Sequence, residues 1–226
     1  MPATPTNTNP PAALLSAMLD VTEQRVVPLT RAGVSTGSKL FGAAVLLRDG
    51  LSPLTVATND ERVSPLLHGE INCIQQFFSD PWPPGQQQQQ RPATADCVFF
   101  ATHEPCSLCL SGITWSGFNE LYYLFTYEDS RDLFGIPHDI DILREVFRVP
   151  APADTPESLA ARPLYNKTNK FFRARSLSDL VSEIGEEDER SVWRERIERV
   201  KAVYGALSDT YQADKQAGTD SASVWK

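Results

Sequence analysis

The feature that most constrains this chain of 226 residues is a pair of cysteines that are separated by two residues and preceded by a proline. The run is Pro105-Cys106-Ser107-Leu108-Cys109. Proline suits the first turn of a helix, where its missing N–H costs no hydrogen bond and its fixed φ is already helical. Pro105 therefore predicts a helix start, with both thiols one turn apart on one face and near the helix N-terminus, which favours thiolates.

A histidine and a glutamate upstream complete a set of groups suited to a catalytic metal centre. Catalytic zinc takes three protein ligands from cysteine and histidine and keeps a fourth position for water. The pattern predicts one Zn²⁺ per chain, bound by His68, Cys106 and Cys109. Glu70 follows His68 by two residues, so we expect it to carry protons rather than to bind the metal.

Two other interpretations of the cysteine pair remain open. One is a redox Cys-x-x-Cys, and the other is a structural zinc site completed by Cys73 and Cys97. Neither gives a role to Glu70, and Cys73 and Cys97 fall on apolar faces, where buried cysteines are common. His103 ends a predicted strand before Pro105, a poor position for a fourth ligand, so we expect it to support or pack beside the site.

The combination of H-x-E with P-C-x-x-C resembles the signature of the zinc-dependent cytidine/deoxycytidylate deaminase superfamily. The resemblance covers roughly residues 36–148, including Phe41-Gly42-Ala43, Asn59 and the run from Glu104 to Trp115. It implies a hydrolase that replaces the amino group of a nucleobase-like ring with an oxo group and releases ammonia. Zinc would supply activated water, and Glu70 would be the catalytic proton carrier.

Within the superfamily the chain is most similar to guanine deaminases, with cytosine deaminases and transfer-RNA adenosine deaminases as further relatives. The resemblance implies an aromatic base pocket, an asparagine that hydrogen-bonds the base, and an aspartate that engages a purine edge. Two backbone groups would also contact the ring or its amine. The substrate-binding residues so implied are Phe41, Asn59, Gly69, Glu104, Trp115 and Asp139.

Two departures from guanine deaminases leave other substrates and functions open. His138 stands where those enzymes tend to have a second acidic residue, and the last seventy or so residues do not resemble their tail. His68-Gly69-Glu70-Ile71 is also similar to fungal-type cytosine deaminases, so a cytosine or cytidine-type reaction is the second candidate. A non-catalytic subunit of a transfer-RNA adenosine deaminase is a third, although such subunits commonly lack the glutamate. A structural zinc module that binds protein through its C-terminal helix is a fourth.

Alternating strands and helices predict an α/β sandwich. The resemblance implies three layers, α/β/α, around a central mixed sheet of about five strands, with zinc between two helix N-termini. We expect a disordered segment at 1–10 and a deaminase domain at 11–150. A flexible, glutamine-rich insertion is expected at 80–95 and a C-terminal helical extension at 151–226.

Hydrophobic periodicity and turn residues predict the individual elements. Helices are expected at 11–30, bent before Pro28, and at 68–78, 139–147 and from 191 to about 211. Strands are expected at 41–47, 54–57, 97–102 and 121–125, with a hairpin turn at Asp49-Gly50. A loop is expected at 127–136 and a linker at 150–163.

The net charge of −8 at pH 7 argues for a small-molecule substrate and against a polynucleotide, because nucleic-acid binding depends on basic residues. One basic stretch is an exception, with Arg162, Lys167, Lys170, Arg173 and Arg175 interleaved with Tyr165, Phe171 and Phe172. It fits either a site for phosphate or a nucleic-acid strand, or a solvated connector whose aromatics pack on the core. We favour the connector. With four cysteines, no apolar run of membrane-spanning length and no basic secretory start, we expect a cytoplasmic protein without membrane contact. We also expect a homodimer, and the apolar stripe of the C-terminal helix would cover either the core or the second subunit.

Overall fold

The computed structural model describes residues 8–80 and 91–218 of the chain. Most of the expected disordered N-terminus and the whole glutamine run therefore lie outside the described residues. No helix in the described ranges is long and apolar enough to cross a membrane.

A mixed sheet of five strands forms the centre of the molecule, as expected. The strands are β1 (Gly42–Leu47), β2 (Pro53–Thr58), β3 (Cys97–His103), β4 (Glu120–Phe125) and β5 (Arg173–Ser176). Their order is β2-β1-β3-β4-β5. β1 pairs antiparallel with both β2 and β3, whereas β3, β4 and β5 are parallel. The carboxyl ends of β3 and β4 therefore lie at one edge, where the chain continues into the cysteine run.

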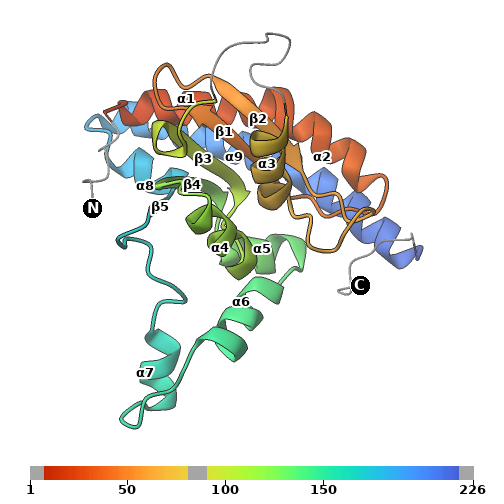
Figure 1. Ribbon diagram of the computed structural model, residues 1–226, viewed down its shortest axis with the longest axis vertical. Coiled ribbons are helices and arrows are strands. Elements are labelled where there is room, and N and C mark those ends of the chain that lie inside the picture. Colours follow the sequence, from red (N-terminus) through yellow and green to blue (C-terminus); the bar gives the residue numbers. More distant parts are fainter. Residues whose placement is uncertain (1–7, 81–90, 219–226) are drawn as a thin grey trace.

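Side chains alternate along the strands between two apolar cores, one on each face of the sheet. In β1, Ala43 and Val45 join one core, while Ala44 and Leu46 join the other. α3 (Gly69–Ser79) and α4 (Ser107–Trp115) cover the first face. The opposite face carries a larger helical layer, so the sandwich has the three layers that the sequence predicts (Figure 1).

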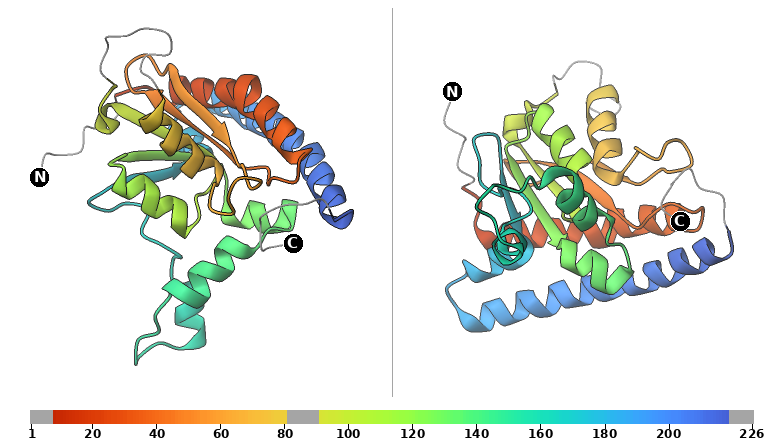
Figure 2. Two further views of the ribbon diagram at one scale, coloured as in Figure 1. Left: turned by 45° about the vertical axis from the view of Figure 1, so that its right-hand side comes forward. Right: turned by 90° about the horizontal axis from the view of Figure 1, so that it is seen from below.

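The larger layer combines helices from the N-terminal and the C-terminal parts of the chain (Figures 1 and 2). It contains α1 (Pro11–Val21), the π-helical turn η1 (Thr22–Val26), α2 (Val27–Val34), α8 (Leu177–Ser182) and α9 (Glu187–Gln216). The π-helical turn η1 lies before Pro28, where the sequence predicts a bend. Ile197, Val200, Tyr204, Leu207 and Tyr211 of α9 are buried in the core that this layer forms with the sheet.

Two predictions about connecting segments are wrong. The loop expected at 127–136 is helix α5 (Tyr127–Phe134), because Thr126 and Asp129 form a capping box and Gly135, with φ 65°, ends the helix. The linker expected at 150–163 contains α7 (Pro156–Ala161), which begins with a capping box at Thr155.

Residues 138–162 form an arm that projects from the body (Figures 1 and 2). It consists of α6 (His138–Ile142), the π-helical turn η3 (Leu143–Phe147) and α7, and the chain then returns to the sheet as β5. β5 and α8 therefore come from a stretch in which the sequence predicts only helices. A short 3-10 helix, η2 (Thr94–Asp96), precedes β3.

Candidate active site

Three predicted metal ligands meet where the N-termini of α3 and α4 face each other. His68 is the N-cap of α3, and Cys106 is the N-cap of α4. Pro105 thus precedes the helix instead of lying in its first turn, and the Cys106 sulfur accepts a hydrogen bond from the Cys109 amide at 3.5 Å. The potential ligand atoms of His68, Cys106 and Cys109 lie within 4.8 Å of one another.

The separations of these atoms fit tetrahedral zinc. A zinc ion bonded at about 2.3 Å to sulfur and about 2.0 Å to nitrogen holds the two kinds of ligand atom roughly 3.5 Å apart. The His68 Nδ1 atom lies 3.5 Å from the Cys106 sulfur and 3.6 Å from the Cys109 sulfur. These three groups are therefore already placed for one metal ion.

The electrostatics of the two thiols also fit a cation. A hydrogen bond with Cys109 lowers the pKa of Cys106 well below its usual value, although burial opposes this shift. Burial, followed by the hydrogen bond with Cys106, raises the pKa of Cys109 well above its usual value. Without a cation the first thiolate thus keeps the second thiol protonated, and a divalent cation supplies the charge that lets both ionise.

Glu70 lies beside the three ligand residues, in the first turn of α3. It is buried, and its Oε2 atom has no hydrogen-bond partner among the described residues. Burial and, next, the nearby Cys106 raise the pKa of Glu70 to about 7. A buried carboxyl group that changes protonation near neutral pH is suited to accept and return protons.

Asn59 joins the end of β2 to the first turn of α3. Its side-chain Oδ1 atom accepts a hydrogen bond of 2.7 Å from the backbone N–H of Gly69. Its backbone N–H donates a hydrogen bond of 3.1 Å to the Phe41 carbonyl. The Asn59 Nδ2 atom is buried and unpartnered among the described residues. The side-chain carbonyl of Asn59 is therefore used within the fold, while its side-chain N–H groups remain available as hydrogen-bond donors.

Gly69 allows α3 to approach the sheet closely. A Cβ atom at this position would lie 2.8 Å from the Gly42 Cα atom and 2.9 Å from the Phe41 carbonyl oxygen. Both neighbours are backbone atoms of the β1 region, so they cannot turn aside. The helix that carries His68 and Glu70 thus depends on a residue without a side chain between them.

The other predicted substrate residues differ in their burial and in their surroundings. Asp139, in the first turn of α6, is partly buried, and its pKa is raised to about 7, first by burial and then by Cys106 and Glu70. Phe41 is buried and its ring centroid lies 4.3 Å from that of His103. Trp115 ends α4, and its side chain is 91% exposed and packs against little of the described chain.

The Glu104 side chain anchors the segment that leads to Pro105 through hydrogen bonds and an ion pair. Its carboxylate accepts hydrogen bonds from the Tyr165 hydroxyl at 2.8 Å and the Tyr127 amide at 3.3 Å, and pairs with Lys167 at 2.8 Å. The Tyr127 hydroxyl donates a hydrogen bond of 2.5 Å to the Pro105 carbonyl. No role for Tyr127 was predicted, although the capping box that places it, from Thr126 to Asp129, can be read in the sequence.

His103 and the remaining cysteines pack in the interior. His103 Nδ1 lies 2.9 Å from the Thr102 hydroxyl, and its ring stacks on Phe125. Cys73 and Cys97 are buried in the core that contains α3 and α4, and neither belongs to the metal-ligand cluster found in the described part of the chain.

The fold and this ligand set define a zinc-binding α/β protein in which a buried carboxyl group accompanies a His-Cys-Cys site. Residues 23–125 match the family described as "Cytidine and deoxycytidylate deaminase zinc-binding region". This match over residues 23–125 supports the cytidine/deoxycytidylate deaminase superfamily for the chain.

Solved structures of similar proteins include two guanine deaminases. The one from Bacillus subtilis is 22% identical, over 67% of this chain and 86% of its own, with a TM-score of 0.42. The one from Nitrosomonas europaea is 20% identical, over 76% of this chain and 80% of its own, with a TM-score of 0.39. A structure from a study of transfer-RNA A34 deaminases is 20% identical, over 46% of this chain and 70% of its own, with a TM-score of 0.36. A search of curated proteins returned no match.

Proposed function

We propose that this protein is a zinc-dependent hydrolytic deaminase of an amino-substituted nucleobase or related heterocycle, with a guanine-like base as the favoured substrate. The observation that carries the proposal is the buried Glu70 carboxylate, whose Oε2 atom lacks a partner in the described chain beside three groups spaced for zinc. We further propose that the enzyme acts in the cytoplasm as a homodimer.

Glu70 is the proton carrier in this proposal. A zinc ion held by His68, Cys106 and Cys109 would supply activated water for hydrolysis. Glu70 accepts one proton of the attacking water and delivers it to a ring nitrogen, and it then carries the proton of the newly added hydroxyl group to the leaving amine. The substrate thereby gains a carbonyl and loses ammonia. The raised pKa of Glu70, about 7, supports both halves of this cycle near neutral pH.

Substrate recognition falls to groups around Glu70. The unpartnered Nδ2 atom of Asn59 is a hydrogen-bond donor available to a ring acceptor. Asp139 interacts electrostatically with Cys106 and Glu70, which supports its assignment to the polar edge of a purine. The backbone N–H of Gly69 is occupied by Asn59, so Gly69 supports the substrate through Asn59 in this arrangement.

The decisive experiment measures ammonia release from a panel of amino-purines, amino-pyrimidines and pterins, alongside metal content. The variant Glu70→Gln should bind zinc normally and lose roughly 10²- to 10⁴-fold in turnover, since it keeps the shape but cannot carry protons. Glu198→Gln, at an exposed position of α9, makes the same chemical change and should leave turnover intact.

Each result of the panel bears on a different part of the proposal. Guanine or a close analogue as the best substrate supports it in full, whereas cytosine or cytidine would replace the favoured ring and keep the chemistry. Turnover by Glu70→Gln near the wild-type rate would rule out the mechanism. Zinc binding without ammonia release from any compound would favour a non-catalytic subunit.

A further inference from the structure

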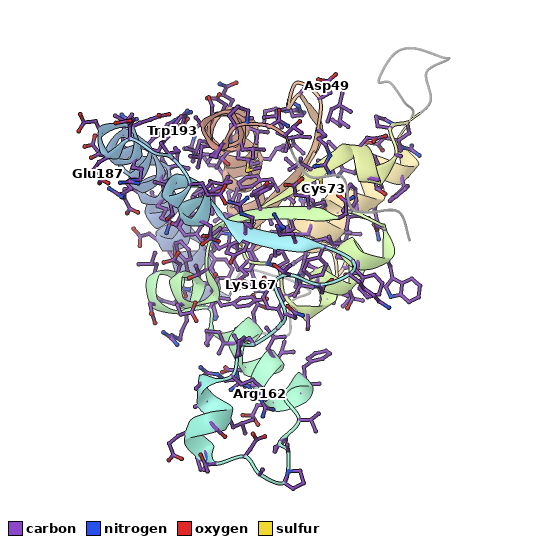
Figure 3. All side chains as sticks on the ribbon, turned by 90° about the vertical axis from the view of Figure 1, so that its left-hand side faces the viewer. Asp49, Cys73, Arg162, Lys167, Glu187 and Trp193 are labelled. Atoms are coloured by element: carbon purple, nitrogen blue, oxygen red, sulfur yellow. The ribbon has the colours of Figure 1, made fainter. Side chains whose placement is uncertain are left out.

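A cavity lies where the arm, residues 138–162, meets the rest of the chain, and Glu104 is part of its lining. It has a volume of about 860 Å³, within the range of small-molecule sites. Its lining comes from the arm, from α5 and from the chain that returns to β5: Glu104, Tyr127, Glu128, Arg144, Arg148, Ala160, Arg162, Pro163, Leu164, Tyr165, Asn166, Lys167 and Thr168. Figure 3 places Arg162 within the arm and Lys167 where the returning chain meets the sheet.

The cavity is basic in a chain whose net charge is −8. Four cationic side chains line it, against two carboxylates. Lys167 is paired with Glu104 at 2.8 Å, and Arg162 is paired with Asp154 at 2.5 Å. Arg144 and Arg148 therefore remain as the cationic lining residues outside these ion pairs, against one remaining carboxylate, Glu128.

Arg144 and Arg148 are placed to act together. Arg144 lies in η3 and Arg148 is its C-cap, and both residues line the same cavity. The Arg148 Nη2 atom donates a hydrogen bond of 2.8 Å to the Arg162 carbonyl, which orients the guanidinium. The Arg148 Nε atom is buried and unpartnered, and no described residue bonds to the Arg144 side chain.

Other residues that line the cavity are apolar or have polar groups that already form hydrogen bonds within the protein. The hydroxyls of Tyr127 and Tyr165 are used by the Pro105 carbonyl and the Glu104 carboxylate, and their rings meet edge to face with centroids 6.1 Å apart. Tyr165 and Leu164 can therefore offer ring and aliphatic surface. Paired guanidiniums bind phosphate oxygens in a bidentate manner, which separates a phosphate from a simple chloride-like anion.

We propose that this cavity binds a phosphorylated small molecule, whose phosphate is held by Arg144 and Arg148 and whose remainder packs against Tyr165 and Leu164. A cavity of about 860 Å³ has the size of a small-molecule site, whereas a nucleic-acid strand is bound along an extended groove. Glu104 forms the floor and precedes the metal ligand Cys106 by two residues. The phosphate could thus belong to the substrate or to a separate effector, and the binding itself does not depend on the proposed deaminase activity.

The experiment is isothermal titration calorimetry of the full-length, zinc-loaded protein. The probes are inorganic phosphate, ribose 5-phosphate, guanosine and cytidine 5′-monophosphates, the two unphosphorylated nucleosides, and a single-stranded RNA oligonucleotide. At least one phosphorylated small molecule should bind more tightly than its unphosphorylated counterpart. Arg144→Ala should weaken that binding by about tenfold or more, because hydrogen bonds to charged groups are lost.

A stability measurement on Arg144→Ala and two further variants separate a binding role from charge and from folding. Arg144 bonds to no described residue, so its replacement should leave the unfolding midpoint unchanged. Arg148→Lys keeps the charge but loses the planar donor pair, and should also weaken binding. Arg199→Ala removes a charge from an exposed position of α9 and should have no effect. The proposal is overturned if no phosphorylated small molecule binds, if nucleosides bind equally well, if Arg199→Ala weakens binding as much as Arg144→Ala, or if only RNA binds.

Kinetics then assign the source of the phosphate, and only this step rests on the proposed function. If the substrate carries the phosphate, the nucleotide should be deaminated with a higher kcat/KM than the nucleoside, and Arg144→Ala should abolish that preference. If the ligand is an effector, it should change the rate with an unphosphorylated substrate without competing for the site. Binding of a phosphorylated ligand without deamination of any substrate would contradict the proposed function but would still support the phosphate site.

Discussion

The amide of Gly69 donates a hydrogen bond of 2.7 Å to the Asn59 side chain, and this bond ties the first turn of α3 to the end of β2. Two residues that the sequence marks separately thus form one structural unit. The unit places His68 and Glu70 on either side of a glycine at which an added Cβ atom would lie only 2.8 Å from the Gly42 Cα atom. Rigid placement of such groups is what a preorganised catalytic site requires.

Gly69→Ala should disturb this unit. The added methyl group would meet the Gly42 Cα atom at 2.8 Å, so the helix must shift, at a cost of about 1–3 kcal/mol in the free energy of unfolding. Zinc affinity should fall with it. The control is Gly205→Ala, in the interior of α9 with no atom near its new methyl group, which should stabilise the protein by up to about 1 kcal/mol. Urea unfolding of both variants checks the prediction, and equal effects would contradict it.

Cys109→Ser should lose zinc, because the weaker hydroxyl ligand cannot replace a thiolate. Free zinc at about 100 times its Kd should stabilise the wild-type protein by about 2.7 kcal/mol, and the variant should not respond. Cys73→Ser removes another buried thiol, from α3, and should keep full zinc content. The measurements are metal analysis and thermal unfolding with and without chelator. Full zinc content in Cys109→Ser would overturn the ligand set.

His103 should make stability depend on pH. Burial, and next Lys201, holds its pKa well below the usual value, so the folded protein keeps the ring neutral. The unfolded chain binds a proton as the pH falls through about 6.5, and stability is therefore lost below that pH by up to about 1.4 kcal/mol per unit.

His103→Phe removes this titration and should flatten the acid side of the stability curve. The measurement is urea unfolding of both proteins between pH 5 and pH 8. Comparing the variant with the wild type cancels the pH dependence of the zinc site, which both share. Parallel curves over the whole range would show that His103 does not titrate on unfolding.

The parts of the fold that periodicity predicts are those with strong apolar patterns. β1, β3 and β4 have buried side chains on both faces, and α9 has a regular apolar stripe. β5 was missed because Arg-Ala-Arg-Ser has no such pattern: it is an edge strand, and its pairing with β4 fixes it. Tertiary contacts far along the chain decide its structure.

Helix α5 was predicted as a loop for a different reason. Its apolar positions are few, and its start depends on the reciprocal bonds between Thr126 and Asp129. This signal was present in the sequence, and a search for capping boxes would have found it. The zinc ligands were predictable because metal chemistry restricts both residue type and spacing, whereas the exposure of Trp115 depends on how α4 ends.

Asp139→Asn should change which ring is accepted and leave the chemistry competent. Asp139 is partly buried on α6 and interacts electrostatically with Cys106 and Glu70, yet it is not among the clustered metal ligands of the described chain. A site built to hydrogen-bond a polar edge discriminates by leaving groups unpaired with the wrong ring. The fall in kcat/KM should therefore be large for purines that present an N–H at this edge and small for rings that do not.

Asp141→Asn is the matched control for this prediction, because Asp141 lies two residues further along α6 and is exposed. It should leave every substrate unaffected. The measurement is kcat/KM for each accepted ring, with zinc content checked in both variants. An equal fall on all substrates by Asp139→Asn would mean that Asp139 is structural or relays protons, since a recognition group cannot weaken all rings alike.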